Sequence, residues 1–248
     1  MNNKSFERLK TLHPIRTSWS DFPEVLIVAD VSPVQGHPNF SAAKSGDLHA
    51  SKYLVDDLMD GKTEHAIRSL IDDKKPVVIP VHALEILGAN TIPAAMAAHL
   101  KFTLSLSVER RVVQINKAGH TRASGWHRLS HPALFDGPIE RGRHYLIVDD
   151  FMGQGGTIAN LRGHIEYSGG RVIGAVTLTG KAYSSKITLS DDTLQALRSK
   201  HGEQFETWWK KKFGYGLDCL TESEARYFLR AESFERIRNQ LAKAGLGE

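Results

Sequence analysis

Two adjacent aspartates followed by a glycine-rich turn are the residues of this chain best suited to chemistry. The segment from Tyr145 to Thr157 has the sequence YLIVDDFMGQGGT, in which Asp149 and Asp150 follow four apolar residues. Main-chain N–H groups in a turn with three glycines can approach a phosphate closely, and a helix that begins there adds partial positive charge. The two carboxylates cannot bind phosphate. They can accept hydrogen bonds from sugar hydroxyls or hold a hydrated Mg²⁺.

Other phosphate-binding motifs fit this segment less well. A Walker loop needs a lysine after its glycines, and here Thr157 directly follows Gly156. A dinucleotide-binding fingerprint needs a glycine at the position of Ile158, and it lacks an acidic pair at the end of its strand. The pattern therefore favours a sugar phosphate as the ligand.

The surrounding pattern predicts the elements that position this segment. Short apolar runs alternate with stretches of helical spacing, which is typical of a parallel sheet covered by helices on both faces. Ligands of such sheets bind beyond the carboxyl ends of the strands, where Asp149 and Asp150 are expected. Thr157 is expected to cap the helix after the turn. The predicted strands are 25–31, 76–81, 102–108, 111–115, 145–148 and 171–178, and the predicted helices are 41–60, 91–100, 157–167 and several beyond 190, one of them opened by a capping box at 221–224.

The segment 145–157 resembles the signature that binds 5-phosphoribosyl 1-pyrophosphate (PRPP) in type I phosphoribosyltransferases. A weaker resemblance extends from Val25 to Lys181. It implies a phosphoribosyltransferase-like α/β core domain over residues 1–185, with a parallel sheet flanked by helices. Residues 186–248 are then a helical C-terminal extension or subdomain.

The resemblance also implies roles for the residues of the signature. Asp149 and Asp150 would contact the ribose hydroxyls and, through water, a Mg²⁺ ion. Many members have a hydroxyl residue or an aspartate at the position of Gly153, and in oxopurine salvage enzymes this aspartate acts on the base. The glycine at this position argues against oxopurine salvage. The residues implied to hold the 5-phosphate are Gly153, Gln154, Gly155, Gly156 and Thr157.

Two further loops of the family correspond to polar segments here. The first, at Val81, His82 and Ala83, would contact pyrophosphate, and a cis peptide between Val81 and His82 is expected by analogy. A structural turn is the alternative interpretation. The second, 117–132, resembles the loop that closes over the site, and an ordinary solvated basic loop is its alternative. Its basic residues are Lys117, which would bind pyrophosphate, His120 and Arg122, which would be catalytic, and His127 and Arg128; Arg110 and Arg111 flank the preceding strand.

Residues after the strand 171–178 correspond to the family's acceptor region. Lys181 could donate hydrogen bonds to an acceptor carbonyl, and Tyr183 could stack on a heterocycle. For each residue taken singly, a surface loop is the favoured interpretation. The spacing of His120, His127 and His131 fits no common zinc site.

Composition limits the remaining possibilities. The chain has 248 residues, a net charge of +4 and one cysteine, Cys219, which excludes an internal disulfide framework and is expected to be inert. Residues 1–12 lack the apolar core of a secretion signal, so a cytoplasmic protein without a membrane span is expected. The run from Trp208 to Phe213 favours tryptophan packing with a solvated lysine side over a nucleic-acid patch.

These observations predict a Mg²⁺-dependent phosphoribosyltransferase. It would transfer phosphoribosyl from PRPP to a nitrogenous, nucleobase-like acceptor and release pyrophosphate, and similar enzymes are commonly homodimers. The alternative is a non-catalytic module that senses PRPP or a nucleotide, and a nucleic-acid-associated effector is a third, weaker reading. The sequence does not name the acceptor.

Overall fold

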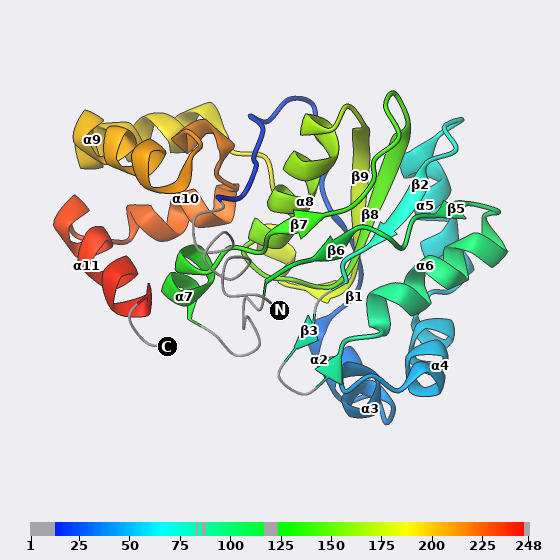
Figure 1. Ribbon diagram of the computed structural model, residues 1–248. Helices are drawn as coiled ribbons and strands as arrows, with labels where there is room; N and C mark the ends of the chain where they lie inside the picture. The colour runs from blue at the N-terminus through cyan, green and yellow to red at the C-terminus, as the bar shows by residue number, and fades with distance from the viewer. Residues whose placement is uncertain (1–12, 83, 86–87, 117–123, 246–248) are drawn as a thin grey trace, which may run out of the picture.

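The computed structural model describes residues 13–82, 84–85, 88–116 and 124–245 (Figure 1). Its centre is a five-stranded sheet in which every neighbouring pair of strands is parallel. The strand order is β1-β9-β8-β2-β5, which places the long strand β8 in the middle. The strands are β1 (Leu26–Ala29), β2 (Val77–Pro80), β5 (Ser107–Val108), β8 (His144–Met152) and β9 (Arg171–Gly180).

Helices cover both faces of the sheet because its central strands are apolar on both sides. Leu146 and Val148 of β8 belong to one buried cluster, and the alternate residues Tyr145 and Ile147 belong to another. The first cluster includes residues of α2 (Val31–Gln35), α3 (Phe40–Lys44), α4 (Leu48–Leu58), α5 (Gly61–Ile71) and α6 (Ile92–Thr103). The second includes residues of α8 (Gly156–Tyr167) and is flanked by the hairpin of β6 (Val113–Gln114) and β7 (Phe135–Asp136). A further short ladder joins β3 (Leu84–Glu85) to β4 (Gly88–Ala89).

Three predicted elements have different bounds. The helix predicted at 41–60 is two helices, because Gly46 has φ 104° and the Asp47 side chain caps α4 by accepting from two main-chain N–H groups. The strand predicted at 102–108 is wrong over most of its length, since α6 continues to Thr103 and only Ser107–Val108 pair as a strand. The strand predicted at 25–31 ends at Ala29, and α2 begins at Val31.

Strand β8 is longer than predicted and contains both aspartates. Its register pairs Asp149 with Thr177 and Met152 with Gly180 of β9. On its other side, pairing with β2 ends where Pro80 meets Val148. The aspartates therefore lie past the carboxyl end of β2 while they are still paired with β9.

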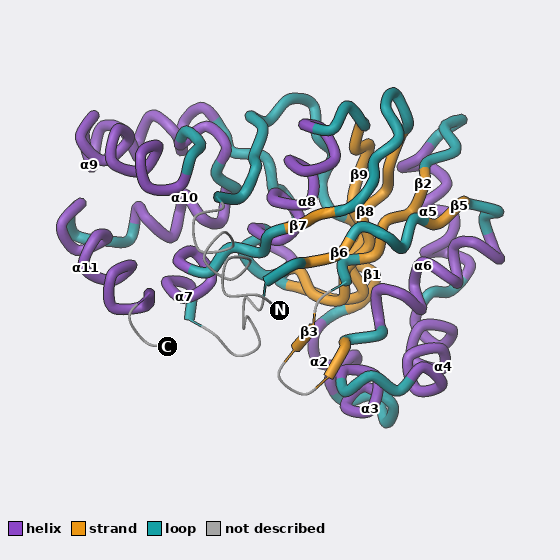
Figure 2. The backbone as a smooth tube through the Cα atoms, viewed as in Figure 1, coloured by secondary structure: helices purple, strands orange, loops and turns teal. Residues whose placement is uncertain are grey.

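A second body of helices lies beside the sheet (Figure 2). It consists of α9 (Asp191–Phe213), α10 (Glu222–Leu229) and α11 (Phe234–Gly245), with short 3-10 turns at Ala182–Ser184 and Leu217–Cys219. The capping box predicted at Thr221 and Glu224 is confirmed. Trp209 is fully buried and Trp208 is partly buried in the core of these helices, which confirms the packing interpretation of this run.

The predicted architecture, a parallel α/β sheet flanked by helices with a helical C-terminal extension, is confirmed. The division at residue 185 stays a prediction. The core of the C-terminal helices also takes in Trp19 and residues of α7 (Gly125–Ser130), which precede that boundary.

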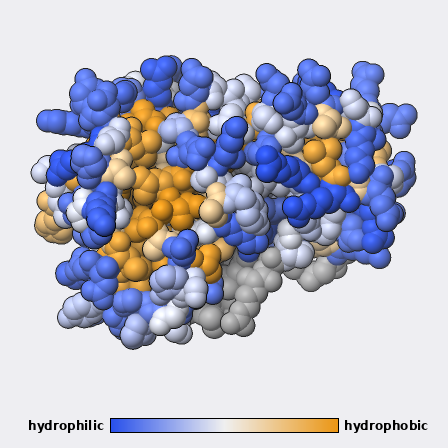
Figure 3. Space-filling view, turned by 180° about the vertical axis from the view of Figure 1, so that it is seen from behind, coloured by the Kyte–Doolittle hydropathy of each residue, from blue (hydrophilic) through white to orange (hydrophobic). Residues whose placement is uncertain are grey.

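Two surface properties complete the fold. Apolar residues gather on the half of the rear face that holds the sheet (Figure 3), and all four residues of the edge strand β1 are partly exposed. Among the helices of the described residues, none combines the length and the apolar character needed to cross a membrane.

Candidate anion-binding site at the carboxyl edge of the sheet

Asp149 and Asp150 lie in contrasting surroundings. Asp149 is 8% exposed, and its Oδ1 accepts from the Asp150 N–H at 2.8 Å. Burial raises the pKa of Asp149 well above its ordinary value, and the Asp150 carboxylate raises it further. Lys44 Nζ, from α3, donates to Asp150 Oδ2 at 2.8 Å. Lys44 was missed in the sequence, where it is one basic residue in a polar stretch far from the signature.

The glycine turn leads from β8 into α8. Gly155 has φ 82° and is the N-terminal cap residue of α8, so the helix begins at Gly156 and no side chain caps it. The predicted capping role of Thr157 is therefore wrong. Within the described part of the chain, the N–H groups of Gly153, Gln154 and Gly155 have no acceptor, and the first N–H groups of any helix lack intrahelical partners.

Three glycines of the turn are packed against side chains from distant parts of the chain. A β-carbon on Gly153 would lie 2.5 Å from Nη1 of Arg128, which belongs to α7. One on Gly155 would lie 2.8 Å from Ile187, and one on Gly156 would lie 2.7 Å from Oε1 of Glu224. A side chain at any of the three positions would force its neighbour to shift, and Gly155 also has the positive φ that favours glycine.

The carboxylate beside Gly156 is neutralised by a buried arginine. Arg16 Nη1 donates to Glu224 Oε2 at 2.6 Å and its Nη2 donates to Oε1 at 2.9 Å, and the two side chains are each 3% exposed. Arg16 Nε also donates to Asn160 Oδ1 of α8 at 2.6 Å. Thr221 Oγ1 donates to the main-chain oxygen of Gln154 at 2.6 Å. The C-terminal helices are thereby attached to the turn and to α8, a connection with no local signal in the sequence.

Arg128 is a cation beside the turn without a counter-ion among the described residues. Its Nε is buried and has no hydrogen-bond partner there. Burial lowers the pKa of its guanidinium, and no carboxylate opposes this effect. An arginine buried in this way pays a desolvation cost that an anionic ligand would offset.

Further buried polar atoms without partners lie around the same edge. Thr177, paired with Asp149 in the sheet, and Thr179, two residues further along β9, both have buried hydroxyls that lack hydrogen bonds in the described structure. Gln154 Oε1, in the turn itself, also lacks a donor there. Most buried polar atoms in folded proteins are paired, so these atoms are available to bond a ligand or water.

Other predicted site residues surround the edge. Val81 N–H donates to Val148 O at 2.9 Å, so His82 leaves the sheet next to the aspartates. Burial lowers the pKa of His82, and the nearby Arg110 lowers it further. Among the described residues no peptide bond is cis, so the expected cis bond between Val81 and His82 is absent. Ala83, Lys117, His120 and Arg122 lie outside the described residues.

The proposed acceptor residues follow β9. Lys181 N–H donates to Met152 O at 3.0 Å, which places this loop beside the start of the turn. The Lys181 ammonium lies 5.8 Å from the centre of the Tyr183 ring, and both side chains are exposed. Cys219 is buried and its pKa is raised to about 11, which agrees with an inert thiol.

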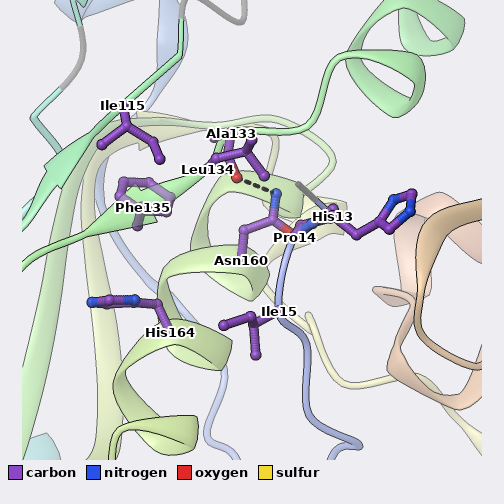
Figure 4. A pocket seen from close by; sticks show the side chains of 9 residues that line it. All are labelled: His13, Pro14, Ile15, Ile115, Ala133, Leu134, Phe135, Asn160 and His164. Carbon is purple, nitrogen blue, oxygen red and sulfur yellow. Dashed lines mark hydrogen bonds between the residues drawn. The ribbon is translucent and has the colours of Figure 1, made fainter. Parts of the chain in front are cut away.

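A small cavity of about 80 Å³ lies further along α8, between the N-terminal segment and the β6–β7 hairpin (Figure 4). Asn160 Nδ2 donates across it to Ala133 O at 2.9 Å. Neither Asp149 nor the glycine turn lines this cavity. In the described residues no three His, Cys, Asp or Glu side chains form a cluster that could hold a metal directly.

The sequence of this chain is similar to two proteins whose names state no activity. No protein-family model matches this chain. It is 39% identical over 229 residues to the protein TraN of Escherichia coli, a match that covers 92% of this chain and 51% of TraN. It is 36% identical over 152 residues to an uncharacterised protein of Haemophilus influenzae, covering 61% of this chain and 34% of that protein. The chain thus spans about half the length of TraN and a third of the second relative.

Similar solved structures include adenine and orotate phosphoribosyltransferases. The adenine phosphoribosyltransferase of Saccharomyces cerevisiae is 16% identical, with a TM-score of 0.35, over 73% of this chain and 91% of that one. Identity and superposition are both too low for residue roles to be transferred.

Proposed function

We propose that the carboxyl edge around Asp149–Thr157 binds PRPP and that the chain is a Mg²⁺-dependent phosphoribosyltransferase acting on a nitrogenous acceptor. One observation carries the proposal. Gln154 Oε1 in the glycine turn is buried without a hydrogen-bond partner, and the Arg128 guanidinium lies against Gly153 without a counter-ion among the described residues. Main-chain amides at a helix N-terminus next to an arginine suit a phosphate group.

In this proposal the glycine turn binds the phosphate of PRPP and the preceding aspartate binds its ribose. The amides of Gly153–Gly156 and the Arg128 guanidinium bind the 5-phosphate, and Asp150 accepts from a ribose hydroxyl. As the bond between C1 and the pyrophosphate oxygen breaks, positive charge develops on the sugar and negative charge on pyrophosphate. His82 and Arg110, past the ends of β2 and β5, are placed to stabilise the leaving group, and the acceptor nitrogen forms the new bond to C1.

The carboxylates fit a hydrated Mg²⁺ only in part. Oδ2 of Asp150 accepts from Lys44, and the carboxyl group of Asp149 lies beside this carboxylate. The raised pKa of Asp149 makes that carboxyl a weak ligand for a cation. Asp150 Oδ1 would hold a metal-bound water, and the ion would supply charge neutralisation to the diphosphate of PRPP.

The same features give support to a second candidate function, a PRPP-sensing or nucleotide-sensing module without transfer. Asp149 is almost inaccessible and Asp150 is engaged by Lys44, so the free protein keeps its acidic pair occupied. Binding through the turn and Arg128 does not need these carboxylates to be free. A homodimer stays a prediction for either function.

Calorimetric titration with PRPP and Mg²⁺ tests the binding proposal. Asp150→Asn should reduce PRPP affinity by about tenfold or more, since it removes the charged acceptor of a ribose hydroxyl. Wild-type affinity in this variant would reject the role given to Asp150. Release of pyrophosphate with a panel of nucleobases then separates the two functions, because tight binding without turnover supports the sensing module.

A further inference from the structure

A second concave surface lies on the helical body, away from the carboxyl edge of the sheet. It is a groove of about 290 Å³ between α7, α10 and α11. This volume is at the lower end of the range for small-molecule sites, roughly 300–1,000 Å³, and suits one compact ligand. Its lining residues are Trp126, Tyr227, Arg230, Ala231, Glu232, Arg236 and Gln240.

Two aromatic rings form the apolar part of the groove. The centres of the Trp126 and Tyr227 rings are 4.7 Å apart, with 57° between their planes. Trp126 is fixed from behind by Phe228, whose ring centre is 6.0 Å away, and the Tyr227 ring packs on Gly125 so closely that a β-carbon there would lie 2.5 Å from it. Both rings are only partly buried, so they offer a rigid surface on which a planar group can stack.

The polar part of the groove carries a positive charge. Arg230 and Arg236 both line it, and neither has an ion-pair partner among the described residues. Glu232 is the one carboxylate in the lining, which leaves an excess of one positive charge there. Guanidinium groups bind phosphate through paired hydrogen bonds.

From this juxtaposition we propose that the groove binds a planar heterocycle that carries a phosphate, in the size range of a nucleoside monophosphate. The heterocycle stacks on the Trp126 ring with the tilted Tyr227 ring at its edge, and Arg230 and Arg236 bind the phosphate. The site shares no lining residue with the aspartates or the glycine turn, so it is independent of the proposed PRPP site. Its volume favours a single nucleotide over a strand.

The experiment uses AMP, GMP, CMP and UMP as probes in calorimetric titrations of the full chain. Arg230→Ala and Arg236→Ala should each weaken binding by about tenfold or more, because each removes a charge-assisted hydrogen bond to phosphate. Arg238→Ala is the matched control, since Arg238 is exposed on the same helix and outside the groove, and should leave affinity within about twofold. Ribose 5-phosphate should bind about tenfold more weakly than the nucleotides because it has no base to stack.

Two results would overturn the proposal. The first is that none of the four mononucleotides binds at about millimolar concentration. This result would overturn the proposal even if a single-stranded ten-nucleotide oligomer bound through Arg230 and Arg236. The second is nucleotide binding that survives both groove substitutions and is lost in Asp150→Asn, which would place the nucleotide at the carboxyl edge. Failure of PRPP to bind at that edge would leave the groove result unaffected, so the two proposals are tested separately.

Discussion

Replacement of Arg128 by alanine distinguishes a ligand-binding role from a structural one. Arg128 lies against Gly153, has no partner among the described residues, and has a pKa lowered by burial. If its guanidinium binds phosphate, its loss removes a charge-assisted interaction worth about 1.5–3 kcal/mol. That corresponds to roughly a 10- to 150-fold loss of PRPP affinity.

The same substitution should not weaken the fold. No ion pair or hydrogen bond of the guanidinium to the described residues is lost, and the cost of burying an uncompensated charge disappears. We therefore expect the thermal midpoint of Arg128→Ala to stay unchanged or to rise. A structural arginine would behave in the opposite way, since its removal would lower the midpoint.

Calorimetry with PRPP and thermal denaturation of the same samples give the two readouts. Arg143→Ala is the control, because Arg143 is an exposed arginine just before β8, at the opposite end of that strand from the glycine turn, and forms an ion pair with Glu140 at 3.5 Å. It should leave PRPP affinity unchanged. Unchanged affinity in Arg128→Ala, or a large fall in its midpoint, would refute the reasoning.

Three further predictions concern the buried groups around the turn. Because the folded state raises the pKa of Asp149, the native protein binds more protons than the unfolded chain, and stability should fall as pH rises from the ordinary aspartate range through the raised pKa. Asp149→Asn should remove this fall in urea denaturation between about pH 4 and pH 8, and an identical pH profile in both proteins would contradict the prediction. Arg16→Ala leaves Glu224 buried without its partner and should cost about 3–5 kcal/mol of unfolding free energy, whereas a loss below about 1 kcal/mol would show that water reaches the carboxylate. Gly156→Ala should destabilise by about 1–3 kcal/mol through contact with Glu224, while Gly61→Ala, which meets no atom within 4 Å, should be neutral or stabilising; equal effects in chemical denaturation would argue against the packing role.

The sequence predicted the elements of the core well where local pattern decides the structure. Apolar runs of four or more residues identified β2, β8 and β9, and the glycine turn identified the start of α8 to within one residue. The wrong bounds of the predicted helix 41–60 and the predicted strand 102–108 have other causes. Asp47 caps a new helix within the stretch that hydropathy alone predicts as one continuous helix. Phe102, the first residue of the predicted strand, belongs to the last turn of α6.

The sequence predicted only the site residues that are consecutive in the chain. The aspartates and the glycines are consecutive in the chain, so their spacing indicates phosphate chemistry directly. Lys44, Arg16 and Glu224 reach the same place through tertiary packing, and nothing in their own neighbourhoods distinguishes them from surface charges. Arg128 was named as a loop cation, and its position against Gly153 depends on α7 packing on the C-terminal helices.

The packing of the glycine turn also has a consequence for biosynthesis. The ion pair that flanks Gly156 joins residues 208 positions apart, and Ile187 and Arg128 reach the other glycines from different segments. Closure over such separations is entropically costly and comes late in folding. A nascent chain that has emerged only as far as β9 holds the whole signature and yet lacks Ile187 and Glu224, which pack against Gly155 and Gly156. The ribosome must release α10 before the turn can take its final form.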